Sequence, residues 1–220
     1  MMTVRRASLM DASGIARVSV ETWRATYRGM MPDVILDNLP VAERTEFIRD
    51  RLNEGASQRM TFVAEDETGQ IIGFAACGPA RTPDPPPTPP VHGGRDGSST
   101  PPAGGGRGSG PAPRVDGGMG SGSAPPAGGG MGGYTGAIYA LYVLPAYQGQ
   151  GIGRDLVAAV VHFLRAQGHA VMLVRVLAAN PARGFYERLG GVAVGETEIV
   201  IRDTPLTEVG YGFTFDTTRL

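Results

Sequence analysis

Three glycines alternate with other residues in the segment Gln148-Gly149-Gln150-Gly151-Ile152-Gly153-Arg154. Because glycine has no Cβ atom, such a segment lets successive backbone NH groups converge on one anion. A helix predicted to begin at Gly151 adds the unpaired NH groups of its first turn and the positive end of its dipole. The spacing of these residues therefore predicts a phosphate-binding loop.

The same spacing excludes two common nucleotide-binding sites. A dinucleotide fingerprint requires a glycine at the sixth position counted from Gly149, where this chain has Arg154. A phosphate-loop nucleotide site requires a lysine, but all 20 basic residues are arginines. The absence of lysine also excludes Schiff-base catalysis by a lysine side chain.

Two motifs resemble those of the Gcn5-related N-acetyltransferase (GNAT) superfamily. The first is the pattern Gln-x-x-Gly-x-Gly from Gln148, which follows a run ending in Leu141-Tyr142-Val143-Leu144-Pro145. It is similar to the loop that holds the pyrophosphate of acetyl-CoA in that family. The second lies between Asn180 and Gly191, where an asparagine precedes a short predicted helix bearing Tyr186. The resemblance spans the chain apart from a Gly/Pro-rich tract.

The resemblance implies a fold, a cofactor and a set of binding residues. In similar enzymes two neighbouring strands, here those ending at Val143 and Leu177, splay apart, and the pantetheine arm of acetyl-CoA lies between them like an added strand. Backbone groups of Leu141, Tyr142 and Val143 would bond the pantetheine amides and the developing oxyanion. Residues 148–154 would hold the pyrophosphate.

The same resemblance implies roles for two side chains. Tyr186 matches the general acid that protonates the departing thiolate, and Asn180 matches a side chain that binds the cofactor arm or orients a water near it. Each also has a plain structural interpretation, because asparagine is a good helix cap and a tyrosine ring packs well in a core.

The general base is not evident in the sequence. Many similar enzymes carry a glutamate early in the strand before the phosphate loop, but this chain has Ala137 near that place. Glu21, Glu196 and Glu198 are alternatives, acting directly or through water, although surface carboxylates are usually only solvated.

Trp23 and Tyr27 lie four residues apart and share one face of the first predicted helix. In similar proteins the first two helices and their connection wall the acceptor pocket, so these rings are candidates for that wall. Core packing explains them equally well.

Hydrophobic periodicity predicts an α/β fold in which helices flank a mixed central sheet. Helices are expected from Asp11 to about Tyr27, over residues 41–55 and 151–167, and from Asn180 through Tyr186. The second of them should carry Val41, Phe47, Ile48 and Leu52 on one side. Strand-like runs occur at residues 3–7, 60–64, 71–77, 137–144, 170–177, 195–201 and 207–215.

One tract departs from this pattern. Residues 79–136 contain 18 of the 34 glycines and 13 of the 18 prolines. Such a composition has too few apolar side chains to offset the entropy of ordering, so we expect a long disordered insertion within one GNAT-like domain that spans residues 1–220. The tract could instead tether the domain to a partner.

The composition narrows the possible binding partners and the expected cellular location of the protein. The 20 basic and 21 acidic residues nearly balance, so no nucleic-acid or membrane surface is indicated. The single cysteine, Cys77, lies in an apolar run and is expected to be buried, and His162 lies in a predicted helix without partners for a triad or a metal site. Without a signal peptide, a cytoplasmic protein is expected.

These observations favour an enzyme that transfers an acetyl group from acetyl-CoA, without a metal, to a primary amine. The acceptor would be a small molecule or a peptide, it would attack directly in a ternary complex, and the enzyme would be a monomer or a homodimer. The alternative is a catalytically inactive module that binds acetyl-CoA or CoA, because the strand glutamate is absent.

Overall fold

The structure is a computed structural model, and it describes residues 2–54, 58–80, 133–201 and 204–216. Its strands are, in chain order, β1 (Thr3–Arg6), β2 (Met60–Glu65), β3 (Ile71–Pro79), β4 (Gly136–Val143), β5 (Val171–Leu177), β6 (Val192–Ile201) and β7 (Thr204–Thr214). Its helices are η1 (Leu9–Asp11), α1 (Ala12–Thr26), α2 (Asp33–Asp37), α3 (Val41–Asn53), η2 (Pro145–Tyr147), α4 (Ile152–Ala166) and α5 (Arg183–Arg188).

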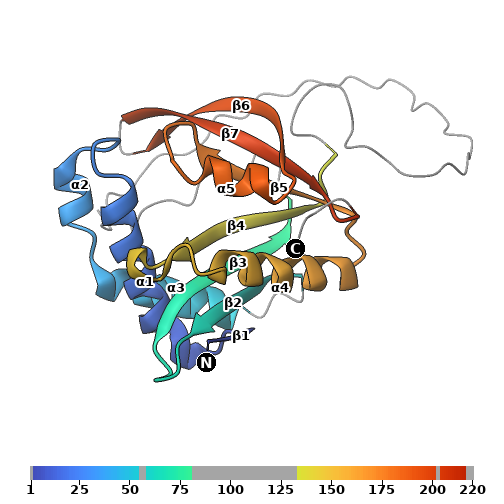
Figure 1. Ribbon diagram of the computed structural model, residues 1–220. Coiled ribbons are helices and arrows are strands. Elements are labelled where there is room, and N and C mark those ends of the chain that lie inside the picture. Colours follow the sequence, from blue (N-terminus) through green and yellow to red (C-terminus); the bar gives the residue numbers. More distant parts are fainter. Residues whose placement is uncertain (1, 55–57, 81–132, 202–203, 217–220) are drawn as a thin grey trace, which may run out of the picture.

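All seven strands form one mixed sheet in the order β1-β2-β3-β4-β5-β7-β6. Neighbouring strands are antiparallel except for β4 and β5, which are parallel. Helices α1 and α3 pack together behind the sheet as drawn in Figure 1, and α4 crosses its front over β2, β3 and β4. The predicted single α/β domain with a mixed sheet between helices is confirmed.

Helix α1 begins where a short network of polar groups fixes the chain. Asp11 accepts two hydrogen bonds of 2.8 Å from the Arg5 guanidinium and one of 2.7 Å from the backbone NH of Ser8. Hydrogen bonding to Arg5 lowers the pKa of Asp11 to about 2. The expected helix start at Asp11 is therefore confirmed, and β1 is held to α1 by a charged pair.

Helix α4 buries the apolar stripe that its sequence predicts. Leu156, Val160, Phe163 and Leu164 are each at most 5% exposed. This packing fixes the N-terminus of α4 next to the end of β4, so the glycine-rich segment joins a buried strand to a rigid helix.

The apolar side expected for the second helix is only partly buried. In α3, Ile48 is buried, but Val41 and Phe47 are each 41% exposed, whereas Arg44 is only 7% exposed. The Phe47 ring lies between two guanidinium groups, with the Cζ atoms of Arg44 and Arg51 at 5.0 and 5.2 Å from its centroid. Attraction between these cations and the ring replaces the expected apolar contact. The short helix α2 was not expected either.

The boundaries of the Gly/Pro-rich tract also need correction. Pro79 is the last residue of β3 and pairs with Gly136, the first of β4, while the Ala80 NH donates to the Thr135 carbonyl at 2.8 Å. Both ends of the tract therefore belong to the sheet. The expected disordered insertion otherwise falls on residues 81–132, which lie outside the described residues.

Candidate active site

Strands β4 and β5 pair over only part of their length. Their parallel register runs from Gly136 and Met172 to Ile138 and Val174 and then stops. Beyond it, β4 pairs only with β3 and β5 only with β7. In Figure 1 the β5–β7–β6 part of the sheet diverges from β4 accordingly. The expected splay between the strands ending at Val143 and Leu177 is thus present.

The backbone of β4 presents alternate residues to the open edge. The Leu144 NH donates to the Ile72 carbonyl of the β3 side at 2.9 Å. Since backbone groups alternate in direction along a strand, Tyr142 also faces β3, whereas Leu141 and Val143 face the edge that β5 leaves unpaired. The Val143 carbonyl accepts a hydrogen bond of 2.9 Å from Gln148 Nε2. The glycine-rich segment is thereby tied to the strand end.

The segment after β4 has the backbone that a phosphate loop requires. Gly149 and Gly151 have φ angles of 77° and 86°, which favour glycine, and open space surrounds the position of a Cβ at either. Gln148, Gly149, Gln150, Gly151 and Arg154 are exposed, and Ile152 is buried.

The first turn of α4 leaves NH groups without helical acceptors. The NH of Asp155 donates to the Gly151 carbonyl at 3.1 Å. Helix geometry gives the preceding NH groups, those of Ile152, Gly153 and Arg154, no acceptor within the helix. They can bind an anion beside the positive end of the helix dipole.

Gly153 serves a different purpose from the other two glycines. A Cβ there would lie 3.1 Å from the ring of Phe185 in α5. Its small size lets α5 approach the start of α4. The loop and the helix that carries Tyr186 are therefore brought together by direct packing.

Asn180 lies just before α5 and is 8% exposed. Its Oδ1 accepts a hydrogen bond of 2.8 Å from the Ala182 NH, which closes a turn before the helix. The N-cap of α5 is Ala182, without a side-chain cap, so the expected helix cap at Asn180 is wrong. Asn180 also interacts with the Tyr27 hydroxyl. Asn180 therefore connects the turn before α5 to α1.

Tyr186 is the buried aromatic residue of α5, with 7% of its surface exposed. Its ring stacks on that of Tyr211, with centroids 6.0 Å apart. Burial, and to a smaller extent the nearby Tyr142, raises the pKa of the Tyr186 hydroxyl above its ordinary value. The hydroxyl is consequently held in its protonated form.

Trp23 and Tyr27 lie in the core beside the splay. They are 5% and 8% exposed, their ring centroids are 4.8 Å apart, and Trp23 Nε1 donates to the Tyr142 hydroxyl at 2.9 Å. Of the two interpretations of this pair, core packing describes them better, and together with Tyr142 they form a wall behind the divergence of β4 and β5.

The three carboxylates proposed as bases are all exposed. Glu21 is 49% exposed and lies 3.5 Å from an Arg17 nitrogen, and Glu196 and Glu198 lie on the edge strand β6. By contrast, Glu208 of β7 is only 3% exposed. Sequence reasoning missed Glu208, although a carboxylate inside an otherwise apolar strand-like run was a signal for it.

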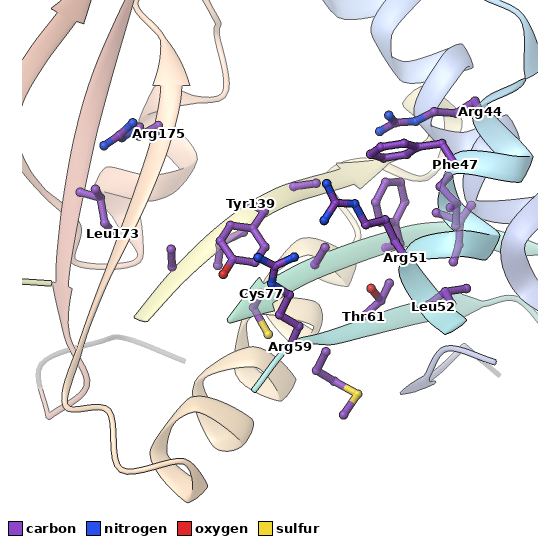
Figure 2. A pocket seen from close by; sticks show the side chains of 18 of the residues that line it. Arg44, Phe47, Arg51, Leu52, Arg59, Thr61, Cys77, Tyr139, Leu173 and Arg175 are labelled. Carbon is purple, nitrogen blue, oxygen red and sulfur yellow. The ribbon is translucent and has the colours of Figure 1, made fainter. Parts of the chain in front are cut away.

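A cavity of about 250 Å³ opens on the α3 side of the sheet. Residues 137–140 of β4 form its floor, Leu173 and Arg175 of β5 and Glu208 of β7 close one side, and α3 closes another. Figure 2 shows the guanidinium groups of Arg44, Arg51, Arg59 and Arg175 around it. The cavity therefore abuts the point where β4 and β5 part.

Ala137 is 4% exposed and lies on the cavity floor, so the position where similar enzymes carry glutamate offers no base. Cys77 also lines the cavity, at 1% exposure, and burial raises its thiol pKa to about 12. Its expected burial is confirmed. His162 is exposed on α4.

Among residues 2–54, 58–80, 133–201 and 204–216, no three His, Cys, Asp or Glu side chains are grouped as metal ligands. No helix in the same part of the chain is long and apolar enough to cross a bilayer.

Comparison with known proteins agrees with this geometry. Residues 127–200 match the family described as FR47-like protein. Over 213 residues the chain is 30% identical to an uncharacterised N-acetyltransferase of Bacillus subtilis strain 168, YuaI, in a match covering 97% of this chain and 93% of that protein.

Solved structures share the fold. PaiA N-acetyltransferase from Thermoplasma acidophilum, in complex with coenzyme A, superposes with a TM-score of 0.62 at 14% identity and covers 97% of this chain and 99% of its own. The protein yncA of Salmonella typhimurium, assigned as an acetyltransferase, was solved with its cofactor acetyl-CoA. It superposes with a TM-score of 0.57 at 19% identity, and the match covers 98% of this chain and 94% of yncA. With its two motifs, its splayed sheet and its curated relative, this chain belongs to the Gcn5-related N-acetyltransferase superfamily.

Proposed function

We propose that this protein transfers the acetyl group of acetyl-CoA to a primary amine by direct attack in a ternary complex. The observation that carries the proposal is the parting of β4 from β5 immediately before a loop with unpaired NH groups. An extended thioester arm fits along the open edge of β4, and a pyrophosphate fits at the start of α4.

The donor would be held mainly by backbone groups. Leu141 and Val143 face the open edge and would bond the pantetheine amides and polarise the thioester carbonyl. Tyr142 contributes its side chain to the wall behind them. Residues 148–154 would bind the pyrophosphate through their amides, with the exposed guanidinium of Arg154 adding positive charge in the first helical turn.

Tyr186 would act as the general acid and Asn180 would position its helix. Burial keeps the Tyr186 hydroxyl protonated, so a proton is available as the carbon–sulfur bond breaks. Asn180 fixes the turn before α5 through the hydrogen bond that it accepts from the Ala182 NH, and any contact it makes to the cofactor arm would be additional. No metal and no covalent acyl-enzyme are required.

An inactive acetyl-CoA-binding module remains the second candidate, because Ala137 occupies the place of the usual glutamate. Two measurements separate the candidates. Calorimetric titration with acetyl-CoA tests binding, and thiol release across amino acids, polyamines, aminoglycosides and peptide N-termini tests transfer. Binding with acceptor-dependent thiol release supports the enzyme, whereas binding with no release on any acceptor supports the module.

A further inference from the structure

The cavity beside α3 contains two buried charged groups of opposite sign. Arg44 is 7% exposed and Glu208 is 3% exposed. Within the described part of the chain, neither Arg44 Nε nor Glu208 Oε2 has a hydrogen-bond partner. A buried charged atom left without a partner is costly, and a ligand or a catalytic role is one explanation for such an atom.

The Arg44 side of the cavity is strongly positive. Arg44 and Arg51 lie on either side of the Phe47 ring, and Arg59 lies over the ring of Tyr139 at 5.7 Å. Figure 2 shows these guanidinium groups around the cavity, beside β4. Several guanidinium groups beside aromatic rings suit a carboxylate or another compact anion.

The Glu208 side of the cavity lies toward the open edge of β4, where the thioester would lie. Glu208 pairs with Leu177 in the β5–β7 ladder, which is past the last β4–β5 pair at Ile138 and Val174. A carboxylate here faces the gap in which the donor arm would run. It therefore occupies the side of the cavity from which an amine would reach the acetyl carbon.

We propose that this cavity binds the acceptor, that the acceptor is a small amine that also carries an anionic group, as an amino acid does, and that Glu208 is its general base. Arg44 would receive the anionic group, and Glu208 would receive the ammonium group. This inference rests on the proposed acetyl transfer, and it adds the class of acceptor and the identity of the base.

The reaction balances with the groups named. Glu208 accepts one proton from the ammonium, and the freed amine nitrogen forms a bond to the acetyl carbon. The carbon–sulfur bond then breaks, and the thiolate takes a proton from Tyr186. The nitrogen loses its second proton as the amide forms, which restores Tyr186, and Glu208 releases its proton to solvent. The products are the N-acetyl compound, CoA with a free thiol and one proton.

The environment of Glu208 suits a base. Burial raises the pKa of its carboxyl above the ordinary value, and Arg175 on β5 partly opposes that shift. Tyr142 on β4 also lies within its electrostatic reach. A carboxylate that binds protons more tightly than usual is a better acceptor from an ammonium ion.

The first test uses the wild-type protein and matched acceptors. Thiol release from acetyl-CoA is measured with L-phenylalanine, L-methionine and L-glutamine, and with the uncharged-body amine that remains when each α-carboxylate is removed. The amino acid of at least one pair should show kcat/KM about 10²-fold or more above that of its decarboxylated partner, because the partner leaves a buried arginine unpaired. Equal use of both members of every active pair would overturn the anionic-acceptor inference while leaving acetyl transfer intact. Silence of the whole panel, with acetyl-CoA still bound, would overturn both.

The second test uses variants of the two charged groups. Arg44→Gln should raise KM for the preferred amino acid and bring its kcat/KM to within about tenfold of the decarboxylated amine. Glu208→Gln should lower kcat by about 10²-fold or more with unchanged affinity for acetyl-CoA. Arg49→Gln and Glu46→Gln, on the exposed face of α3, are the matched controls. An effect on kcat from Glu198→Gln in place of Glu208→Gln would place the amine in the separate hollow lined by Glu198 and contradict the proposal.

Discussion

At the scale of single residues, burial sets the protonation of the two groups that exchange protons in the proposed reaction. Burial raises the pKa of both Tyr186 and Glu208, which suits the first as an acid and the second as a base. For the phenol, a raised pKa keeps the proton in place until a thiolate appears. For the carboxyl, a raised pKa strengthens its hold on the proton that the ammonium gives up.

Removal of the Tyr186 hydroxyl tests the acid role. Tyr186→Phe keeps the ring that stacks on Tyr211 and should lower kcat by about 10²-fold without changing the dissociation constant of acetyl-CoA. Steady-state kinetics and calorimetry together measure both quantities. Tyr134→Phe is the control, because the buried Tyr134 hydroxyl has no hydrogen-bond partner in the described residues. Unchanged kcat in Tyr186→Phe would show that the ring only packs.

The cost of burying Glu208 should be visible in the stability of the protein. Because its pKa is raised in the folded state, the folded protein binds more protons than the unfolded chain in the pH interval between the ordinary carboxyl pKa and the raised one. Stability therefore falls as pH rises through that interval. Glu208→Gln should be more stable than wild type at pH 8 and lose that advantage at pH 4, as measured by urea unfolding. A variant less stable than wild type at pH 8 would mean that the carboxylate is well compensated by Arg175.

At the scale of secondary-structure elements, two short connections position the site. The turn between β4 and α4 needs positive φ at Gly149 and Gly151, and the start of α1 needs the Arg5–Asp11 pair. The first connection aims NH groups at an anion, and the second anchors the helix that carries Trp23 and Tyr27. Substitutions in the two connections should therefore have different effects.

Gly151→Ala should weaken acetyl-CoA binding. A side chain at φ 86° costs about 1–2 kcal/mol of strain, and relief of that strain turns the neighbouring NH groups away from the pyrophosphate. We expect the dissociation constant to rise about tenfold, by calorimetry. Gly69→Ala is the matched control, because Gly69 has φ 81° and equally open space in the β2–β3 turn. It should lose similar stability and bind acetyl-CoA normally; equal weakening by both substitutions would contradict a specific role for the loop.

Asp11→Asn should destabilise the fold by about 1–2 kcal/mol at pH 7, because a charge-assisted pair to a half-exposed arginine is lost. The lowered pKa of Asp11 gives the sign: the stabilisation is present above the ordinary carboxyl pKa and is lost as pH falls toward about 2. Chemical unfolding at pH 7 and pH 3 should therefore show a smaller difference at the lower pH. A difference that grows on acidification would contradict this assignment.

Local patterns of the sequence predicted most of the elements but not the cavity. The stripe of α4 and the glycine-rich turn are properties of neighbouring residues, so periodicity and spacing were sufficient for them. Phe47 is more exposed than an apolar residue is expected to be, because Arg44 and Arg51, three and four residues away on the same helix, hold its ring. Glu208 is distant in sequence from both motifs, and only the pairing of β5 with β7 brings it beside the splay.

At the scale of the whole molecule, the β3–β4 pairing puts the two ends of the tract at one end of these strands and the glycine-rich loop at the other. Residues 79 and 136 are paired at the end of the two strands, and the glycine-rich loop follows the opposite end of β4. The pairing of these two strands therefore holds residues 79 and 136 next to each other. We therefore expect the sheet to form without the residues between them.

Deletion of residues 83–130 tests that expectation. The melting temperature and the acetyl-CoA affinity of the shortened chain should match those of the full chain, because the core of the described residues and the residues proposed to bind the cofactor lie outside the deleted part. Differential scanning calorimetry and isothermal titration measure the two quantities. A lower melting temperature or weaker binding would assign the tract a folding or binding role, and lost association with a partner alone would support a tether.

The measurement that bears most directly on the account is an amide NMR titration with acetyl-CoA. The account predicts that the ¹⁵N–¹H signals of residues 149–154, and those of Leu141 and Val143, shift together as the cofactor saturates the protein. Saturable binding that leaves these amides unperturbed would contradict it.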